Sequence, residues 1–376
     1  MSTSLVKESE NFKVSWSYLP DQFCDIDQIL SEFRKFVPTG DFTLGKPLQE
    51  FEKRFAKKMG TKHAIGVNSG TDAIKLSLKA QGVGFGDEVI TTANTFIATV
   101  GAINEIGAKT VFVDCTDDFC MDISQIEAAI SPRTKAIVAV HLTGQMSNMP
   151  EVLKIAQKHN LIVVEDACQA MFAEIDGKKS GTFAKAGCFS LHPLKAINVW
   201  GDGGVVVTND DDFYNMICKL RNHGLKNRDE VEILGYNSRL DTLQAIVGNW
   251  LFEKADWITG QRVANAAILD AGLKNTPQIR LPMRYDNRKL VYHLYIVFAE
   301  RRDELLRYCL ENGIEAKVHY PVPLYQQQGL AHLGYKAGAF PVTDKHAQTM
   351  ISFPMHQHHT PEQMQYVVDV VNKFYK

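Results

Sequence analysis

Short apolar runs alternate with amphipathic helical patterns along most of this 376-residue chain. By length and β-branched content, strand-like runs lie at 63–67, 88–92, 110–114, 136–141, 161–165, 187–190 and 204–208. Helical patterns such as 72–81 and 150–159 separate several of them. This alternation predicts an α/β fold, a mostly parallel, doubly wound sheet with helices on both faces. In such sheets a ligand binds outside the carboxyl ends of the strands.

A second, smaller unit is expected after the sheet, because the chain is long enough for one large domain and a smaller one. Residues 252 to about 273 have the pattern of a long connecting helix, and 290–298 is the clearest strand beyond it. We predict an N-terminal arm and helix at 1–38, a large domain at 39–255 and a smaller C-terminal α+β domain at 256–376.

Charge and hydropathy argue against two kinds of partner. A net charge of −2 gives no sign of the clustered basic surface that nucleic acids require. The first residues lack an apolar signal-peptide core, and no apolar run is long enough to span a membrane. We therefore expect a cytoplasmic protein with neither a nucleic-acid nor a membrane partner.

Cysteine and histidine spacing gives no indication of a metal site. The seven cysteines form no CxxC pair and are expected to be free thiols in a reducing compartment. His356, His358 and His359 lie close together, but the sequence 360–363 that follows has the pattern of a helix N-terminus with a capping box. We expect no bound metal.

Polar side chains follow two neighbouring predicted strands. Asp166 comes directly after an apolar strand, Ser190 ends the next one, and Lys195 follows five residues later. This combination suits pyridoxal 5′-phosphate (PLP): the lysine forms a Schiff base with its aldehyde, and the aspartate keeps its ring nitrogen protonated. A buried carboxylate needs such a cation. The alternatives are a solvated lysine and a helix-capping aspartate.

The segment Ser69-Gly70-Thr71-Asp72 lies where a strand ends and a helix begins. Free N–H groups and hydroxyls at a helix N-terminus bind anions. We therefore assign Gly70, Thr71, Asp72 and Ser190 to the cofactor phosphate. Simple helix capping by Ser69 or Thr71 is the alternative.

Several motifs occur together and in order: GDFTLGKPLQEFE, NSGTDAI, GDEVITTANTFIAT, VVEDACQA, FSLHPLK, GDGG, LRNHG, GYNSRLDTLQA, VHYPVPL and SFPMH. With these motifs the chain resembles the DegT/DnrJ/StrS family of PLP-dependent sugar aminotransferases, from about Thr39 to near the C-terminus. The resemblance implies a fold-type I, aspartate-aminotransferase-like architecture.

The same resemblance implies further cofactor contacts. Gln169 would donate to the phenolic oxygen of the ring, and Phe96 would stack on its face, unless it is a core aromatic. Asn237 would reach the phosphate of a partner subunit, which makes the protein a homodimer with shared active sites. A turn residue in a Gly-Tyr-Asn-Ser loop is the alternative for Asn237.

The implied reaction moves an amino group from L-glutamate, releasing 2-oxoglutarate, to a keto or aldehyde sugar. Nucleotide-linked 3- or 4-keto sugars are the usual acceptors. However, LHPLK and INVWGDGG resemble the lysine segment of members that aminate carbon 8 of oxidised 3-deoxy-octulosonate, giving 8-amino-3,8-dideoxy-octulosonate for lipopolysaccharide. A PLP sugar dehydratase is disfavoured because dehydratases of the family carry histidine in place of Lys195. A non-catalytic regulatory paralogue is disfavoured by the intact Lys195, Asp166 and Ser190.

Substrate contacts are less defined than cofactor contacts. Members often have a histidine directly after HYPxPL, whereas this chain has Tyr325. A planar arginine suits a substrate carboxylate, although Arg221 and Arg239 could instead pair with Asp229 or Asp241. The substrate candidates are His192, Arg221, Arg239, His319 and Tyr320.

Overall fold

The computed structural model describes residues 12–376. Its centre is a sheet of seven strands in the order β1-β9-β8-β5-β4-β2-β3. Five neighbouring strands, from β8 to β3, are parallel, and β9 runs antiparallel to both β8 and β1. The strands are β1 His63–Val67, β2 Glu88–Thr92, β3 Lys109–Val113, β4 Thr134–Val140, β5 Ile162–Asp166, β8 Ala186–Ser190 and β9 Gly204–Thr208. The predicted sheet is confirmed, with strand ends shifted by one or two residues.

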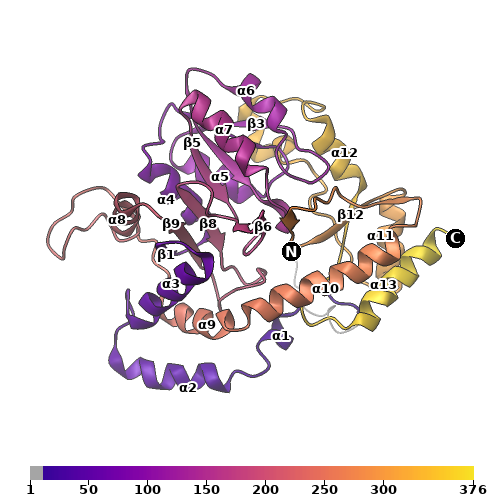
Figure 1. Cartoon of the computed structure of the whole chain (residues 1–376), viewed down its shortest axis with the longest axis horizontal. Helices are drawn as coiled ribbons and strands as arrows, with labels where there is room; N and C mark the ends of the chain where they lie inside the picture. Colours follow the sequence, from indigo (N-terminus) through magenta and orange to yellow (C-terminus); the bar gives the residue numbers. More distant parts are fainter. Residues whose placement is uncertain (1–11) are drawn as a thin grey trace.

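Helices cover both faces of this sheet (Figure 1). One apolar cluster joins the strands to α3 (Lys46–Met59), α7 (Met149–His159) and α9 (Thr242–Phe252). A second cluster, on the opposite face, joins them to α4 (Gly70–Ala80), α5 (Ile97–Glu105) and α8 (Asp211–Leu220). The strands are apolar on both sides because both sides are covered, as in other largely parallel sheets. These layers and the mostly parallel sheet confirm the fold-type I expectation.

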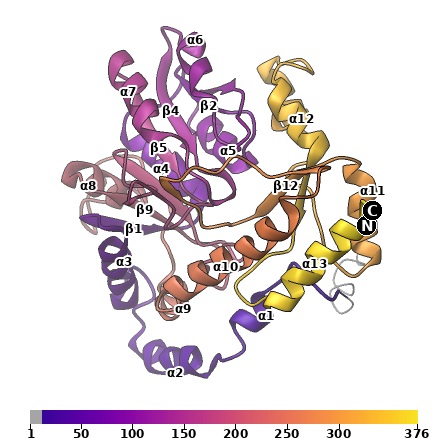
Figure 2. The same ribbon diagram turned by 45° about the vertical axis from the view of Figure 1, so that its right-hand side comes forward.

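A third apolar cluster surrounds a small antiparallel sheet of β10 (Ile279–Arg280), β12 (Tyr295–Ala299) and β13 (Met350–Phe353). Helices α10 (Ala255–Leu273), α11 (Arg302–Glu311) and α13 (Pro361–Phe374) pack on it. Figure 2 shows α10 running from the large sheet to the small one, as expected of a connecting helix. The domain boundaries near 38 and 255 stay predictions.

Two predicted elements differ in detail. The helix expected from 252 begins at Ala255, because α9 ends at Phe252 and a short break separates the two. The strand expected over 290–298 begins only at Tyr295, in β12, since the backbone between β11 (Arg288–Lys289) and β12 hydrogen-bonds elsewhere. Val291 and Leu294 donate to the carbonyls of Gly144 and Thr143, at 3.2 and 3.3 Å. This detour carries His293 to the carboxyl end of the large sheet.

The chain around Val14 belongs to the small unit. Val14 is fully buried in its apolar cluster and pairs with Ile314 in a parallel bridge. The chain then continues through α1 (Leu19–Gln22) to α2 (Asp27–Phe36), which lies along the outside of the large sheet's helices (Figures 1 and 2). Residues 14–18 therefore lie against the body and form part of the site described below.

The remaining elements are short or peripheral. The second small sheet is β11-β6-β7, with β6 at Glu174–Ile175 and β7 at Lys178–Lys179. Helix α6 spans Ile126–Ala129 and α12 spans Pro341–Thr349. At the start of α13, Thr360 and Gln363 form the expected capping box, with Pro361 at the first helical position. No helix within residues 12–376 is long and apolar enough to cross a membrane.

Candidate active site

A cavity of about 400 Å³ lies at the carboxyl ends of β4, β5 and β8, between the large sheet and the small unit. Ten of the residues singled out from the sequence line it: Gly70, Thr71, Phe96, Asp166, Gln169, Ser190, His192, Lys195, His319 and Tyr320. Parallel strands bring these distant segments together because their carboxyl ends meet at one edge of the sheet.

Asp166 ends β5 and is 6 % exposed. Its carboxylate accepts hydrogen bonds from the Thr99 hydroxyl at 2.8 Å and the Cys168 backbone N–H at 3.2 Å. Within residues 12–376 it forms no ion pair. A buried carboxylate without a cation is costly, so the arrangement fits a protonated ring nitrogen.

The start of α4 forms an anion site beside Asp166. Ser69 caps the helix by accepting from the Asp72 N–H at 3.1 Å, which leaves the N–H groups of Gly70 and Thr71 without an intrahelical partner. A Cβ at Gly70 would lie 2.8 Å from Cys168 Sγ and Ser190 Cβ, so only glycine allows this approach. The Ser190 oxygen accepts from the His192 N–H at 3.3 Å, and its hydroxyl proton remains available to a phosphate.

Lys195 lies on a loop that leaves β8. The loop is closed by a turn from the Lys195 N–H to the His192 carbonyl at 2.8 Å. The Tyr18 hydroxyl and the Asn198 amide both donate to the Lys195 carbonyl, at 2.7 and 3.0 Å. Burial lowers the pKa of the Lys195 amine, and the negative charge of Asp166 opposes this. A lysine with a lowered pKa more readily supplies the neutral amine that a nucleophile or base requires.

Gln169, Phe96 and Tyr320 lie together on another part of the cavity wall. The Gln169 side-chain carbonyl accepts from the Thr143 N–H at 2.8 Å, which turns its amide group toward donation. The rings of Phe96 and Tyr320 lie 6.0 Å apart. Phe96 is 49 % exposed, which fits a ring that is covered by a ligand better than a core aromatic. Burial raises the pKa of Tyr320 to about 12, so its hydroxyl stays protonated.

His319 faces the cavity in the neutral form. Its Nδ1 is 2.9 Å from Ser352 Oγ, and its ring stacks on Trp16 with centroids 5.1 Å apart. Burial, and next the charge of Lys317, lower the pKa of His319 to about 4. At neutral pH His319 therefore serves as a hydrogen-bonding group, not as a cation.

Two predicted contacts lie away from the cavity. Asp72 accepts from the Ser238 hydroxyl at 2.6 Å and pairs with Lys75 at 2.7 Å, so its side chain is occupied within the fold. Arg221 is buried and pairs with Glu52 at 2.5 Å. The partner of Arg221 is thus neither a substrate carboxylate nor Asp229 or Asp241, and its expected substrate role is corrected to a structural one.

Asn237 and Arg239 also lie outside the cavity, at the end of a hairpin over 222–238. Asn237 forms an antiparallel bridge with Asn222, and Arg239 donates to the Asn222 side chain at 2.8 Å. The hairpin projects beside α8 (Figure 1). The roles expected for these two residues stay predictions.

Sequence reasoning missed Trp16, Tyr18, Arg262 and His293, all of which line the cavity. Each comes from a segment without a recognisable motif, and no local signal in the sequence marks them. Tyr18 and the Lys195 carbonyl that it contacts are 177 positions apart. Only the packing of the small unit against the large sheet places these side chains at the site.

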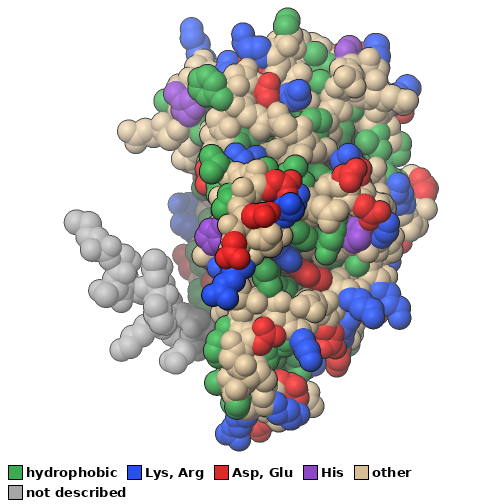
Figure 3. Space-filling model, turned by 90° about the vertical axis from the view of Figure 1, so that its left-hand side faces the viewer, with side chains coloured by type: hydrophobic (Ala, Val, Ile, Leu, Met, Phe, Trp, Pro, Cys, Tyr) green, Lys and Arg blue, Asp and Glu red, His purple; other side chains and the backbone are tan. Residues whose placement is uncertain are grey.

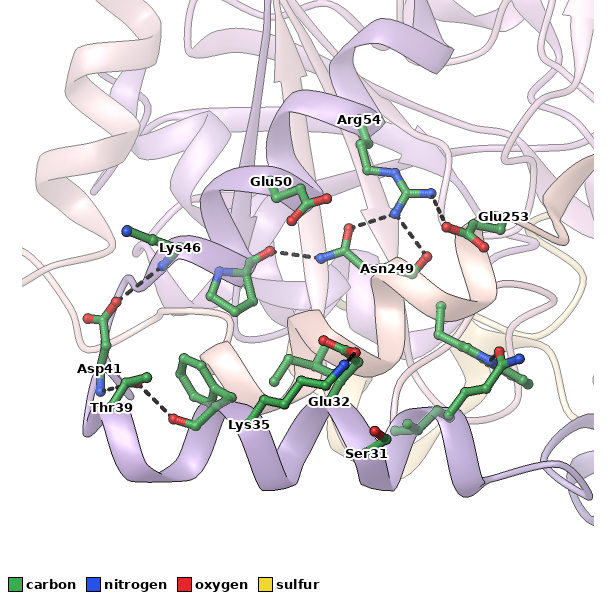
Figure 4. A pocket seen from close by; sticks show the side chains of 16 residues that line it. Ser31, Glu32, Lys35, Thr39, Asp41, Lys46, Glu50, Arg54, Asn249 and Glu253 are labelled. Atoms are coloured by element: carbon green, nitrogen blue, oxygen red, sulfur yellow. Dashed lines mark hydrogen bonds and ion pairs between the residues drawn. The ribbon is translucent and has the colours of Figure 1, made fainter.

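A larger hollow, of about 810 Å³, lies between α2 and the helices α3 and α9. Some of the charged side chains in this hollow, which Figure 4 shows, form ion pairs. Arg54, for example, donates to Asn249 and to Glu253, both at 3.3 Å. The groups with catalytic chemistry described above line the smaller cavity, which is therefore the candidate active site.

The fold and the smaller cavity define a PLP-dependent enzyme of fold-type I. The model of the DegT/DnrJ/EryC1/StrS aminotransferase family matches residues 24–372, and the chain belongs to this family. It is a PLP-dependent sugar aminotransferase.

Similar proteins include enzymes and a protein named for regulation. The "pleiotropic regulatory protein" of Geobacillus stearothermophilus is 41% identical, over 93% of this chain and 95% of the relative. The dTDP-3-amino-3,4,6-trideoxy-alpha-D-glucose transaminase of Micromonospora megalomicea subsp. nigra is 40% identical, over 91% and 93%. The crystal structure of S. venezuelae DesV superposes with a TM-score of 0.94 at 35% identity and covers 96% of this chain and 98% of that one.

Proposed function

We propose that this aminotransferase takes its amino group from L-glutamate and delivers it to the carbonyl carbon of a sugar. The observation that carries the proposal is the Lys195 amine, whose pKa burial lowers, in one cavity with the unpaired Asp166 carboxylate and the α4 anion site. Bound PLP supplies the aldehyde and the electron-withdrawing ring that labilise a proton on the substrate carbon.

The residues of the chain then have distinct tasks. Lys195 moves the proton at the substrate carbon, because it is the lysine that lines the cavity and burial lowers the pKa of its amine. Asp166 keeps the ring nitrogen protonated. The Gly70 and Thr71 N–H groups and the Ser190 hydroxyl hold the phosphate, and Gln169 donates to the phenolic oxygen.

We propose the 8-aldehyde of oxidised 3-deoxy-octulosonate as the acceptor. The support is the lysine segment with its LHPLK and INVWGDGG sequences, which resembles that of the octulosonate enzymes. His192, Leu194 and Lys195 of this segment line the cavity, so its sequence bears directly on the acceptor. Whole-chain identity says less about the acceptor, since a relative named as a regulatory protein is 41% identical and one named as a transaminase is 40% identical.

A nucleotide-linked 3- or 4-keto sugar is the second candidate acceptor. The similarity to the dTDP-sugar transaminase favours it, because that similarity extends over nearly the whole chain. A nucleotide would have to lie beyond the mouth of the cavity, where Phe96 and Leu194 are 49 % and 52 % exposed.

A substrate panel distinguishes the two acceptors. Enzyme loaded with pyridoxamine phosphate is mixed with the octulosonate 8-aldehyde and with dTDP- and UDP-linked keto sugars, and the cofactor absorbance is followed. We expect the octulosonate to restore the PLP spectrum, and excess dTDP or UDP not to inhibit. Strong competitive inhibition by one nucleotide would instead identify a nucleotide sugar as the acceptor.

We further propose that the protein is a homodimer with shared active sites. The support is the projecting 222–238 hairpin, which carries Asn237 and whose Val231 and Leu234 are 62 % and 86 % exposed. Apolar side chains on a projecting hairpin are typical of a surface that is covered by another chain. A cytoplasmic location belongs to the same proposal and is supported by the free thiols of all seven cysteines.

A further inference from the structure

Arg262 of α10 is a buried cation without an acidic partner. It lines the active-site cavity and is 2 % exposed. Its Nε donates to Gln357 Oε1 at 2.9 Å, and its Nη1 donates to the carbonyls of Tyr292 and His293 at 3.1 and 3.3 Å. All these acceptors are neutral, and within residues 12–376 Arg262 forms no ion pair.

Two other enclosed arginines do have an acidic partner, in contrast to Arg262. Arg221 pairs with Glu52 at 2.5 Å, and Arg288 pairs with Asp118 at 3.2 Å. An unpaired buried charge is costly, and burial lowers the pKa of Arg262 for this reason. The Tyr18 ring, 5.3 Å from the guanidinium carbon, is a neutral neighbour because burial raises the pKa of its hydroxyl. An anionic ligand would supply the missing charge.

Arg262 is the cation on the substrate side of the cavity, because burial lowers the pKa of the neighbouring His293 and His319 and keeps both neutral. The carboxylates on the cavity wall are Asp166 and Asp202. Asp166 is assigned to the ring nitrogen, and the phosphate has its own site at α4. Arg262 pairs with neither of these carboxylates, so the substrate is the remaining source of an anion for it.

The position of Arg262 relative to Lys195 restricts which anion fits. Both residues line one small hollow of about 30 Å³, together with Gln169 and His293. Lys195 acts at the carbon that gains or loses the amino group, so an anion bound by Arg262 would lie on the same side of the cavity as that carbon. An α-amino acid carries its α-carboxylate there, whereas the carbonyl carbon of either candidate sugar has no carboxylate attached.

We propose that Arg262 binds the α-carboxylate of the amino donor and of the keto acid formed from it. The proposal rests on the proposed use of an amino acid as donor. A guanidinium has five N–H donors, and three of them are used by the acceptors named above, so the Nη2 group is left for a carboxylate. Arg262 is a donor-specific residue: it acts in the half-reaction with glutamate and is dispensable in the half-reaction with the sugar.

The test measures the two half-reactions separately in the holoenzyme. Arg262→Gln removes the charge, and Arg262→Lys keeps a charge but loses the planar donor pair. The matched control is Arg288→Lys, which alters an enclosed arginine outside the cavity. Cofactor absorbance is followed after PLP enzyme meets L-glutamate, and after pyridoxamine-phosphate enzyme meets 2-oxoglutarate or the octulosonate and nucleotide-sugar panel.

We expect Arg262→Gln to raise the L-glutamate concentration for half-saturation on the order of 100-fold, the size of effect when one partner of a buried charge pair is removed. The reaction with 2-oxoglutarate should weaken equally, whereas the sugar half-reaction should change by less than about 3-fold, since the lost interaction is with a carboxylate on the reacting carbon, and neither candidate sugar carries one there. Arg262→Lys should be intermediate, and Arg288→Lys should behave as wild type in both half-reactions.

Other results would overturn the proposal. Equal losses in both half-reactions, or loss of cofactor, would show that Arg262 only supports the fold. If Arg262→Gln does not fold, the same comparison is made with Arg262→Lys, and 2-oxoglutarate must raise the Tm of the wild-type pyridoxamine-phosphate enzyme more than that of the variant. Wild-type enzyme that reacts with no α-amino acid would overturn the proposed donor and this inference together. If the wild type reacts with L-glutamate and Arg262→Gln reacts equally well, the role of Arg262 is overturned while the proposed donor stands.

Discussion

Lys195 combines burial, which lowers the pKa of its amine, with a main chain that is held from two sides. We predict that Lys195→Ala abolishes turnover while the protein stays folded and binds PLP non-covalently, because Asp166 and the α4 anion site remain. Borohydride reduction of the wild-type holoenzyme followed by peptide mapping checks the assignment. Label on another lysine, such as the exposed Lys185 that pairs with Asp210, would contradict it.

Arg221, unlike Lys195, was a substrate candidate from the sequence, but the structure places it in the interior, away from the cavity. Its guanidinium pairs with Glu52 and also donates to the Gly66 carbonyl at 2.7 Å. We predict that Arg221→Met lowers the free energy of unfolding by about 3 kcal/mol, because it leaves the largely enclosed Glu52 without its cation. Urea unfolding measures this loss. A folded variant whose glutamate saturation also shifts by more than about 3-fold would restore a substrate role.

The lysine loop is the element in which the N-terminal segment meets the active site. Tyr18 donates to the Lys195 carbonyl, and Gln22 donates to the Asn198 side chain at 3.2 Å. We predict that Tyr18→Phe lowers kcat about 10-fold and stability by about 1 kcal/mol, since one hydrogen bond to the loop is lost. PLP should stay bound, as its absorbance will show.

A matched control exists for the Tyr18 prediction. Tyr375 also donates its hydroxyl to a backbone carbonyl, that of Glu300, but at the far end of the molecule. Tyr375→Phe should leave kcat unchanged. If the two variants lose the same activity, the contact from Tyr18 does not position the lysine.

The 222–238 hairpin is the element on which the shared-site proposal depends. We predict that Asn237→Ala weakens PLP retention, and that mixing it with Lys195→Ala under subunit exchange restores part of the activity. In such a heterodimer one site carries both defects and the other carries neither. Activity that stays at the background of the separate variants, although heterodimers are demonstrated, would contradict the shared site.

Charge across the whole molecule is mixed. Acidic and basic side chains are interspersed on the face shown in Figure 3, without a large area of one sign, in line with the net charge of −2. The pH response of stability should therefore come from particular buried groups. Burial is the largest cause that lowers the pKa of His359 to about 4 and the pKa of His356 to about 2.

The sign of the pH effect follows from these directions. An unfolded histidine titrates near pH 6.5, so between about pH 6.5 and 4 the unfolded chain binds more protons than the folded one. We predict that the free energy of unfolding is highest above pH 6.5 and falls by roughly 3 kcal/mol for one such histidine as the pH drops to 4. Urea unfolding at pH 7, 6 and 5 checks this. His359→Gln should flatten the slope, and equal stability at pH 7 and pH 5 would contradict the prediction.

The sequence by itself determined the features that neighbouring residues encode. Alternating apolar runs and helical periods gave the sheet strands to within one or two residues, and Ser69 and Thr360 marked helix starts that the structure confirms. Asp166, Ser190 and Lys195 could be selected because each follows a strand end, and parallel strands bring their ends together whatever the rest of the chain does. The motifs in order identified the family and with it the cofactor.

Tertiary structure alone decided which side chains face the cavity. Arg221 and Arg262 are both arginines on or beside helices, yet one pairs with Glu52 and the other lines the active site without an acid. Tyr18 and His293 reach the cavity because residues 14–18 join the small unit and 290–294 bond to another loop. Local periodicity determines which face of a helix or strand is buried. Which side chains that face contacts depends on segments far apart in the chain, and no local sequence pattern predicts those contacts.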